Sequence, residues 1–236
     1  MGISESVTEV MERASAALLA TSYFEVETLC VKAMELARRS RDFETMARII
    51  LPLQEARRQR RHMATDTGSV KVLVALPSES TVLESACYLL KPPLIAAEAT
   101  SVRELAFAQQ IPAAILTREP RTSTGKWPVV AVTTDRSFRA QIDAPRVNGT
   151  EVADGDAPDI GWFMLAVEAV GDAAIARLKT SDPAVFRVDD LWESMLCLPE
   201  HEKLHQRFIV ECRLAMTEPR PDKLRRRGLF EDLSAF

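Results

Sequence analysis

The chain has 236 residues, of which 47% are hydrophobic and 27% charged, and its formal net charge is −4. These are ordinary values for a globular protein, and the small negative charge provides no general attraction to nucleic acid or to anionic membranes. No apolar run is long enough to predict a membrane span. The first residues carry acids and lack the basic-then-apolar order of a secretory signal, so we expect a cytoplasmic protein.

Residues 3–64 contain almost no helix-breaking residues, and their apolar side chains recur at helical spacing. We therefore expect three helices in this region. Ser4 is a candidate N-cap of the first helix and Asp42 of the third, whereas Pro52 should kink or split the third. The short connections between the helices predict antiparallel neighbours. The expected ranges are 4–22, 23–39 and 42–64.

Residues 22–37, SYFEVETLCVKAMELA, resemble a tetratricopeptide (TPR) helical repeat. The matching positions are an aromatic residue that opens a helix, a small-residue position, and an end similar to A-L-x-L: Tyr23, Val26, and Ala33-Met34 with Leu36. Residues 42–57, DFETMARIILPLQEAR, would begin the next repeat, so the resemblance covers about 60 residues. The chain departs from the pattern because no Trp or Gly marks the first helix and no Pro closes the repeat.

The resemblance to TPR repeats implies a helical surface that binds a protein or peptide. It also implies an open apolar face, because a solenoid needs about three units to bury a continuous core and about one and a half are present. The rest of the chain, or a second copy of it in a homo-oligomer, must then cover that face. An ordinary three-helix packing unit is the alternative interpretation.

Residues 69–147 change to β-branched runs and prolines, after a short linker at residues 65–69. The pattern predicts strand-helix-strand-helix-strand and then a hairpin that turns at Asp135-Arg136-Ser137. This order predicts a small α/β unit with a partly parallel sheet and an antiparallel edge. Ser101 is the candidate cap of the second helix. The expected strands cover 70–76, 94–98, 112–117, 127–134 and 138–143, and the expected helices 80–90 and 101–110.

Residues 157–218 return to helical patterning, and residues 219–236 form a tail. The expected helices cover 158–179, 182–197 and 199–216. The fold class that we expect is therefore α+β (mixed α/β), with helical regions at 1–66 and 157–218 on either side of the sheet unit. All four cysteines lie in apolar surroundings without a C-x-x-C pair, which predicts buried free thiols in a reducing compartment: Cys30, Cys87, Cys197 and Cys212.

The stretch PEHEKLHQRF, residues 199–208, contains the spelling H-E-x-x-H on an expected helix. In that arrangement His201 and His205 could bind one zinc ion, and Glu202 could act as the general base of a hydrolase. Against this, Lys203 places a cation inside the motif, and the downstream sequence offers no histidine as a third ligand. Both histidines also share a helix face with apolar side chains, which predicts packing histidines instead.

Because packing is the favoured interpretation of the two histidines, the sequence offers no set of residues that we expect to be catalytic. We therefore expect a non-enzymatic interaction or scaffold module without a cofactor. The expected partner is a protein or peptide, and we expect neither nucleic acid nor membrane. The candidate binding residues, which we expect to be exposed, are Tyr23, Arg57, Arg58, Arg60 and Arg61.

Two alternatives stay open. One is the zinc-dependent hydrolase with His201, Glu202 and His205. The other is a sensor that binds a small ligand at the carboxyl ends of the strands beginning at Val70 and Pro112.

Overall fold

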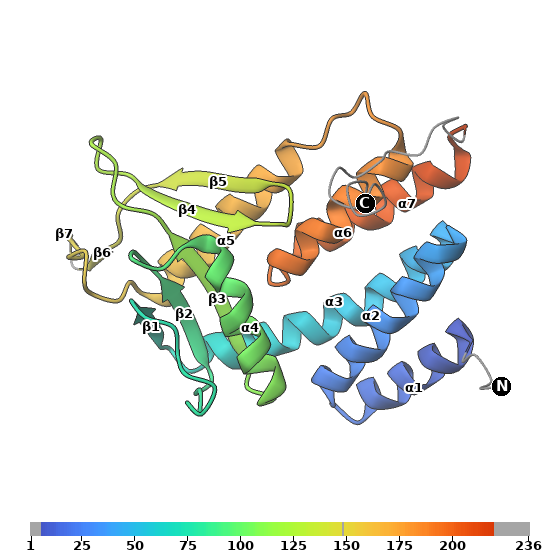
Figure 1. Ribbon diagram of the computed structural model, residues 1–236, viewed down its shortest axis with the longest axis horizontal. Helices are drawn as coiled ribbons and strands as arrows, with labels where there is room; N and C mark the ends of the chain where they lie inside the picture. Colours follow the sequence, from blue (N-terminus) through green and yellow to red (C-terminus); the bar gives the residue numbers. More distant parts are fainter. Residues whose placement is uncertain (1–5, 148, 220–236) are drawn as a thin grey trace, which may run out of the picture.

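Helices surround a five-stranded mixed sheet in the computed structural model, which describes residues 6–147 and 149–219 (Figure 1). The expected α+β class is therefore confirmed. The elements in chain order are α1 (Val7–Leu19), α2 (Tyr23–Ser40), α3 (Phe43–Thr65), β1 (Val70–Leu73), β2 (Ala86–Leu90), the 3-10 helix η1 (Ala96–Glu98), α4 (Ala99–Ala108), β3 (Ala113–Arg118), β4 (Trp127–Val132), β5 (Ser137–Ile142), β6 (Arg146–Val147), β7 (Thr150–Glu151), α5 (Ile160–Ala176), α6 (Ala184–Cys197) and α7 (Glu202–Thr217).

The three front helices begin where side chains satisfy their first N–H groups. The Ser6 hydroxyl accepts from the backbone N–H of Glu9, and the Glu9 carboxylate accepts from the backbone N–H of Ser6. This capping box starts α1, whereas Ser4 lies outside the described residues. Asp42 caps α3 as expected, since its carboxylate accepts from Thr45 N–H. Pro52 lies inside α3 but does not split it, because buried side chains on both sides of the proline hold the helix in the core.

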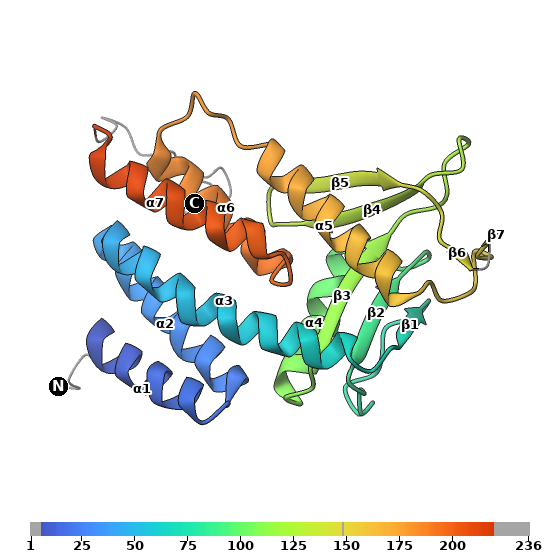
Figure 2. The same cartoon turned by 180° about the vertical axis from the view of Figure 1, so that it is seen from behind.

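The three front helices lie side by side, and α6 and α7 cover their inner face (Figures 1 and 2). Arg38 of α2 pairs with Asp189 of α6, and its guanidinium lies 5.9 Å from the centroid of the Trp192 ring. The back helices therefore contact α2 and α3. The resemblance itself stays a prediction.

The sheet has the strand order β1-β2-β3-β4-β5, in which β1, β2 and β3 run parallel and β4 and β5 form an antiparallel hairpin. Both features are as predicted. Helix α4 packs on one face of the parallel part, and α3 and α5 pack on the other (Figures 1 and 2). Side chains of β2 alternate between the two faces, with Tyr88 and Leu90 toward α4, and Cys87 and Leu89 toward the large core.

Two elements of the sheet unit differ from the sequence-based expectation. The expected helix at 80–90 is wrong, because its second half is strand β2. All residues of β2 are buried, and a short apolar run that is buried on both faces has no periodicity that separates it from a buried helix. The expected strand at 94–98 is also wrong, since η1 occupies this stretch and leads directly into α4. Ser101 is therefore inside α4 and does not cap it.

The three back helices occur as predicted, except that the last one begins later than expected. Asp159 caps α5 by accepting from Trp162 N–H. The last helix, α7, begins at Glu202 rather than near Pro199, and His201 is its N-cap. Buried side chains from the front helices, the sheet and the back helices belong to one continuous core.

Among the described residues, no helix is both long and apolar enough to cross a bilayer.

Helices α5 and α7 approach closely at Gly171, and this contact yields a first prediction. A Cβ atom at Gly171 would lie 2.2 Å from the His201 ring, which is fully buried. We expect Gly171→Ala to lower the free energy of unfolding by about 1–3 kcal/mol, although alanine in a helix ordinarily stabilises by about 1 kcal/mol. Urea denaturation measures this, with Gly155→Ala as the control, because no atom lies within 4 Å of a Cβ at Gly155. An unchanged or raised stability of Gly171→Ala would contradict the packing described.

Candidate functional site

The basic run of α3 enters the interior instead of forming an exposed helix end. Only Arg58 keeps a largely exposed side chain, at 42%, whereas those of Arg57, Arg60 and Arg61 are 5%, 14% and 11% exposed. Tyr23 is half-buried against the core. The expectation that all five candidate binding residues are exposed was therefore wrong. The reason is tertiary: the second half of α3 lies among β2, β3 and α7.

Arg57 is the centre of a buried charge network. Its Nε donates to Glu27 Oε1 over 2.8 Å, and its terminal nitrogen Nη1 donates to the Met195 carbonyl over 3.1 Å. The other oxygen of Glu27 pairs with Arg60. Burial alone would raise the pKa of Glu27, but the two guanidinium groups hold that pKa below its ordinary value. The network therefore connects α2 and α3 with the end of α6.

Arg61 extends this connection to the start of α7. It donates to the backbone carbonyl of Glu200 over 2.9 Å and pairs with the Glu202 carboxylate. The residue that the H-E-x-x-H motif would use as a general base is thus held by a guanidinium. The Glu202 carboxylate therefore takes part in a structural contact between α3 and the start of α7.

The two histidines of the motif face different partners. His205 Nδ1 lies 3.0 Å from the His201 carbonyl, so this nitrogen carries the proton and donates it. The other ring nitrogen, Nε2, lies 3.2 Å from a guanidinium nitrogen of Arg57 and accepts from it. A cationic donor therefore occupies the lone pair that a zinc ion would need.

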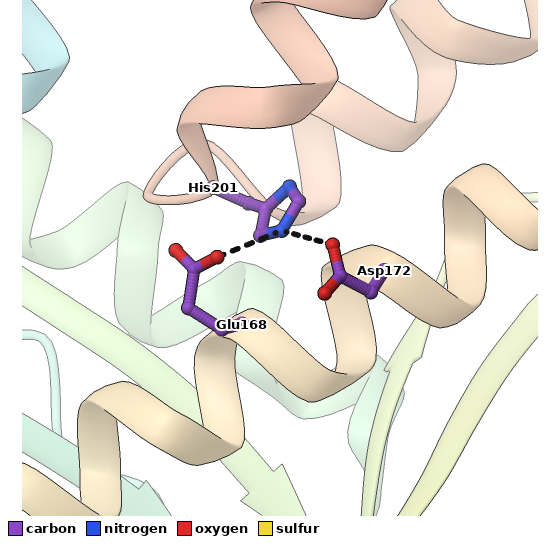
Figure 3. Close-up of side chains that lie close together, drawn as sticks. All are labelled: Glu168, Asp172 and His201. Atoms are coloured by element: carbon purple, nitrogen blue, oxygen red, sulfur yellow. Dashed lines mark ion pairs between the residues drawn. The ribbon is translucent and has the colours of Figure 1, made fainter.

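His201 has a second structural role. Its Nδ1 accepts from the backbone N–H of Leu204 over 3.3 Å, as the cap of α7. The proton of the neutral ring is therefore on Nε2, which points toward Glu168 and Asp172 of α5 at 3.5 and 3.4 Å (Figure 3). A metal ion on Nε2 would require the proton to move to Nδ1, and the cap would be lost.

The cluster of Glu168, Asp172 and His201 already has a cation of its own. Lys203 Nζ lies 3.0 Å from both carboxylates, whose hydrogen bonds raise the pKa of the lysine. Burial lowers the pKa of His201 despite the neighbouring carboxylates. The four side chains form an ion-paired contact between α5 and α7, in which Lys203 already pairs with both carboxylates. The geometry thus supports packing and capping roles for the motif histidines.

A cleft lies where the front helices, the sheet and the α6–α7 connection meet. Its volume is about 360 Å³, within the range of small binding sites. The apolar lining residues are Val31, Ala106, Phe107, Ala113, Ile115, Leu196 and Pro199. The polar ones are Glu27, Thr28, Arg57, Arg60, Arg103, Glu104 and Glu200.

The polar side chains of the cleft are held in fixed positions. Arg60 stacks on Phe24 and Phe107, with its guanidinium carbon 4.1 and 5.1 Å from the two ring centroids. Glu200 Oε1 accepts from the backbone N–H of Ile115 over 3.2 Å, and Arg103 donates to the carbonyl of Ile115 over 2.5 Å. Ile115 lies outside the stretch of β3 that pairs with β4, so these side chains satisfy its backbone groups.

Three buried polar atoms of the cleft residues have no hydrogen-bond partner within the described chain: Arg60 Nε, Arg103 Nε and Glu200 Oε2. Arg103 Nε lies 3.8 Å from Glu200 Oε1, which is too long for a hydrogen bond. An unsatisfied buried group costs about 1–3 kcal/mol, so native proteins rarely keep one without a reason. The three atoms belong to side chains that line the cleft, but the atoms themselves are buried.

Sequence reasoning found the arginines but not their partners. Glu27 stands between Val26 and Leu29 on the apolar face of α2, and an acid at such a position is a signal for a buried ion pair. Arg103 and Glu200 gave no comparable signal, because only the tertiary structure brings them to Ile115.

Comparison with known proteins finds no matching family model, no matching curated protein and no matching solved structure.

The network predicts that two adjacent arginines differ in how much they contribute to the free energy of unfolding. Arg57→Ala should lower the free energy of unfolding by about 3 kcal/mol or more, because it removes the donor to Glu27 Oε1, to the Met195 carbonyl and to His205 Nε2 and leaves Arg60 as the remaining partner of Glu27. Arg58→Ala removes an exposed pair with Glu55 and should change it by less than about 1 kcal/mol. Urea denaturation of both variants tests this, and equal small losses would show that the network does not stabilise the fold.

Burial, followed by the charge of Arg57, lowers the pKa of His205 to about 3. The unfolded chain protonates this ring near pH 6.5, so below that pH the unfolded state binds more protons and stability falls. From pH 6.5 to 5 the loss from this residue should be about 2 kcal/mol. His205→Gln should remove this part of the acid dependence, whereas the exposed His62→Gln should keep it. Denaturant titrations across this range measure the slope, and an unchanged slope in His205→Gln would contradict the assignment.

Proposed function

We propose that this chain is a non-enzymatic binding protein that holds a peptide segment of a protein partner in the cleft. The observation that carries the proposal is the cleft itself, in which the charged side chains of Arg60, Arg103 and Glu200 lie beside apolar ones. Supporting it, helices α2, α3, α4 and α6 and strand β3 provide all the lining residues of the cleft except Pro199 and Glu200, which lie in the α6–α7 connection. The four described cysteines are free and buried, which suits a protein of the reducing cytoplasm.

The available groups favour a peptide over an entirely apolar ligand. A peptide backbone carries N–H donors for Glu200 and carbonyl acceptors for Arg60 and Arg103. An apolar side chain of the same peptide can pack against Phe107, Ile115 and the exposed Leu196. A peptide that pairs with polar groups of the cleft and also buries apolar surface there would gain both affinity and specificity.

Peptide selection with a blocked variant tests the proposal. Thr28 lines the cleft and is exposed, so Thr28→Trp should fill the entrance without disturbing the core. Phage-displayed random peptides are selected on the unmodified protein, and their affinities are measured by fluorescence anisotropy. We expect at least a tenfold loss for Thr28→Trp, about 1.4 kcal/mol or more, and no loss for Thr8→Trp, which changes an exposed threonine of α1.

Two results would contradict peptide binding in the cleft. One is that the selected peptides bind Thr28→Trp as tightly as the unmodified protein. The other is that no peptide is selected, while a fragment library screened by ligand-observed NMR yields compounds that Thr28→Trp excludes. The second result would favour a small-molecule sensor, which uses the same cleft.

A further inference from the structure

A second site lies at the carboxyl ends of β2 and β3, where ligands of parallel sheets commonly bind. Arg118 is the last residue of β3, and Lys91 directly follows β2. Their side chains are 1% and 13% exposed, which is unusual for cations. Both converge on one residue, Asp154, from the segment between β7 and α5.

The contacts with Asp154 are those expected of a bound anion. Arg118 Nη2 lies 2.7 Å from both the carboxylate and the backbone carbonyl of Asp154. Lys91 Nζ lies 2.8 Å from the same carbonyl and 3.3 Å from the carboxylate. Burial alone would raise the pKa of Asp154, but Arg118 and Lys91 hold it below its ordinary value. Two cations thus face a single negative charge.

The Arg118 guanidinium has contacts besides Asp154. It stacks 4.2 Å from the centroid of the Trp127 ring, and Trp127 is itself buried. Its Nη1 also lies 3.3 Å from the Glu119 carbonyl. Arg118 Nε is buried and has no hydrogen-bond partner among the described residues. The arginine is therefore oriented without Asp154, and two cations share one carboxylate.

The Asp154 side chain, in contrast, is 66% exposed and belongs to a surface segment without helix or strand. An aspartate in such a segment competes with free anions only through its effective concentration, which is of millimolar order for short flexible connections.

We propose that Arg118 and Lys91 form a binding site for an anionic ligand with a carboxylate or phosphate group. In the absence of that ligand the carboxylate of Asp154 occupies the site, and the ligand displaces it. Arginine with lysine provides the planar fork and the point charge that recognise either anion. The site shares no residue with the cleft, so the two proposals stand or fall separately.

Removal of the internal carboxylate tests the site. Thermal unfolding of Asp154→Ala is followed with inorganic phosphate, with acetate, and with sodium chloride at matched ionic strength. We expect phosphate or acetate, but not chloride, to raise the Tm by about 3–5 °C at a tenfold excess over Kd. The unmodified protein should need at least tenfold more anion for the same rise. The anion that is more effective identifies the chemical class.

Matched variants separate a site from a general salt effect. Asp156→Ala changes an exposed acid of the same segment and should behave like the unmodified protein. Lys91→Met combined with Asp154→Ala should lose the anion response. If Asp154→Ala does not fold, Asp154→Asn replaces it, because asparagine keeps the size and a side-chain oxygen acceptor and removes the charge. No anion-specific rise in either Asp154 variant would overturn the proposal and leave Asp154 as a structural tie.

Discussion

The pairing of buried Glu27 with Arg57 and Arg60 is the interaction on which the arrangement of this protein depends. Charges removed from water cost several kcal/mol each unless other charges and hydrogen bonds replace the lost solvation. Here the replacements come from α2, α3, the end of α6 and the start of α7. The groups are satisfied only when these four elements meet in one geometry, so the network fixes how the front and back helices pack.

The cleft follows from the same constraint. Arg57, Arg60 and Glu27 line it on one side, and Glu200, whose own backbone carbonyl accepts from Arg61, also lines it. The residues that pair with one another in the network are thus also lining residues of the cleft. Rigid polar groups next to apolar surface are the conditions for selective binding, because they lose little entropy when a ligand orders them further.

The H-E-x-x-H stretch shows that the same sequence motif can have a structural role instead of binding a metal. A zinc hydrolase needs two imidazole lone pairs on one ion and a free carboxylate beside it. In this chain His205 accepts from Arg57, His201 caps α7, and Glu202 pairs with Arg61. Each of these three side chains therefore has a structural partner. The packing interpretation of the two histidines therefore accounts for the geometry, and the motif holds the start of α7 in place.

The sequence by itself determined the elements whose signals are local. Helical periodicity and the Asp42 cap defined α3, and the hairpin of β4 and β5 followed from alternation and a turn. Only the tertiary structure decided that residues 86–90 form a strand and that Arg57 is buried. The physical reason is that burial on both faces erases periodicity, and that a charged side chain enters the core only where distant residues supply its partners. Those partners, at positions 27, 195 and 205, are not neighbours in sequence.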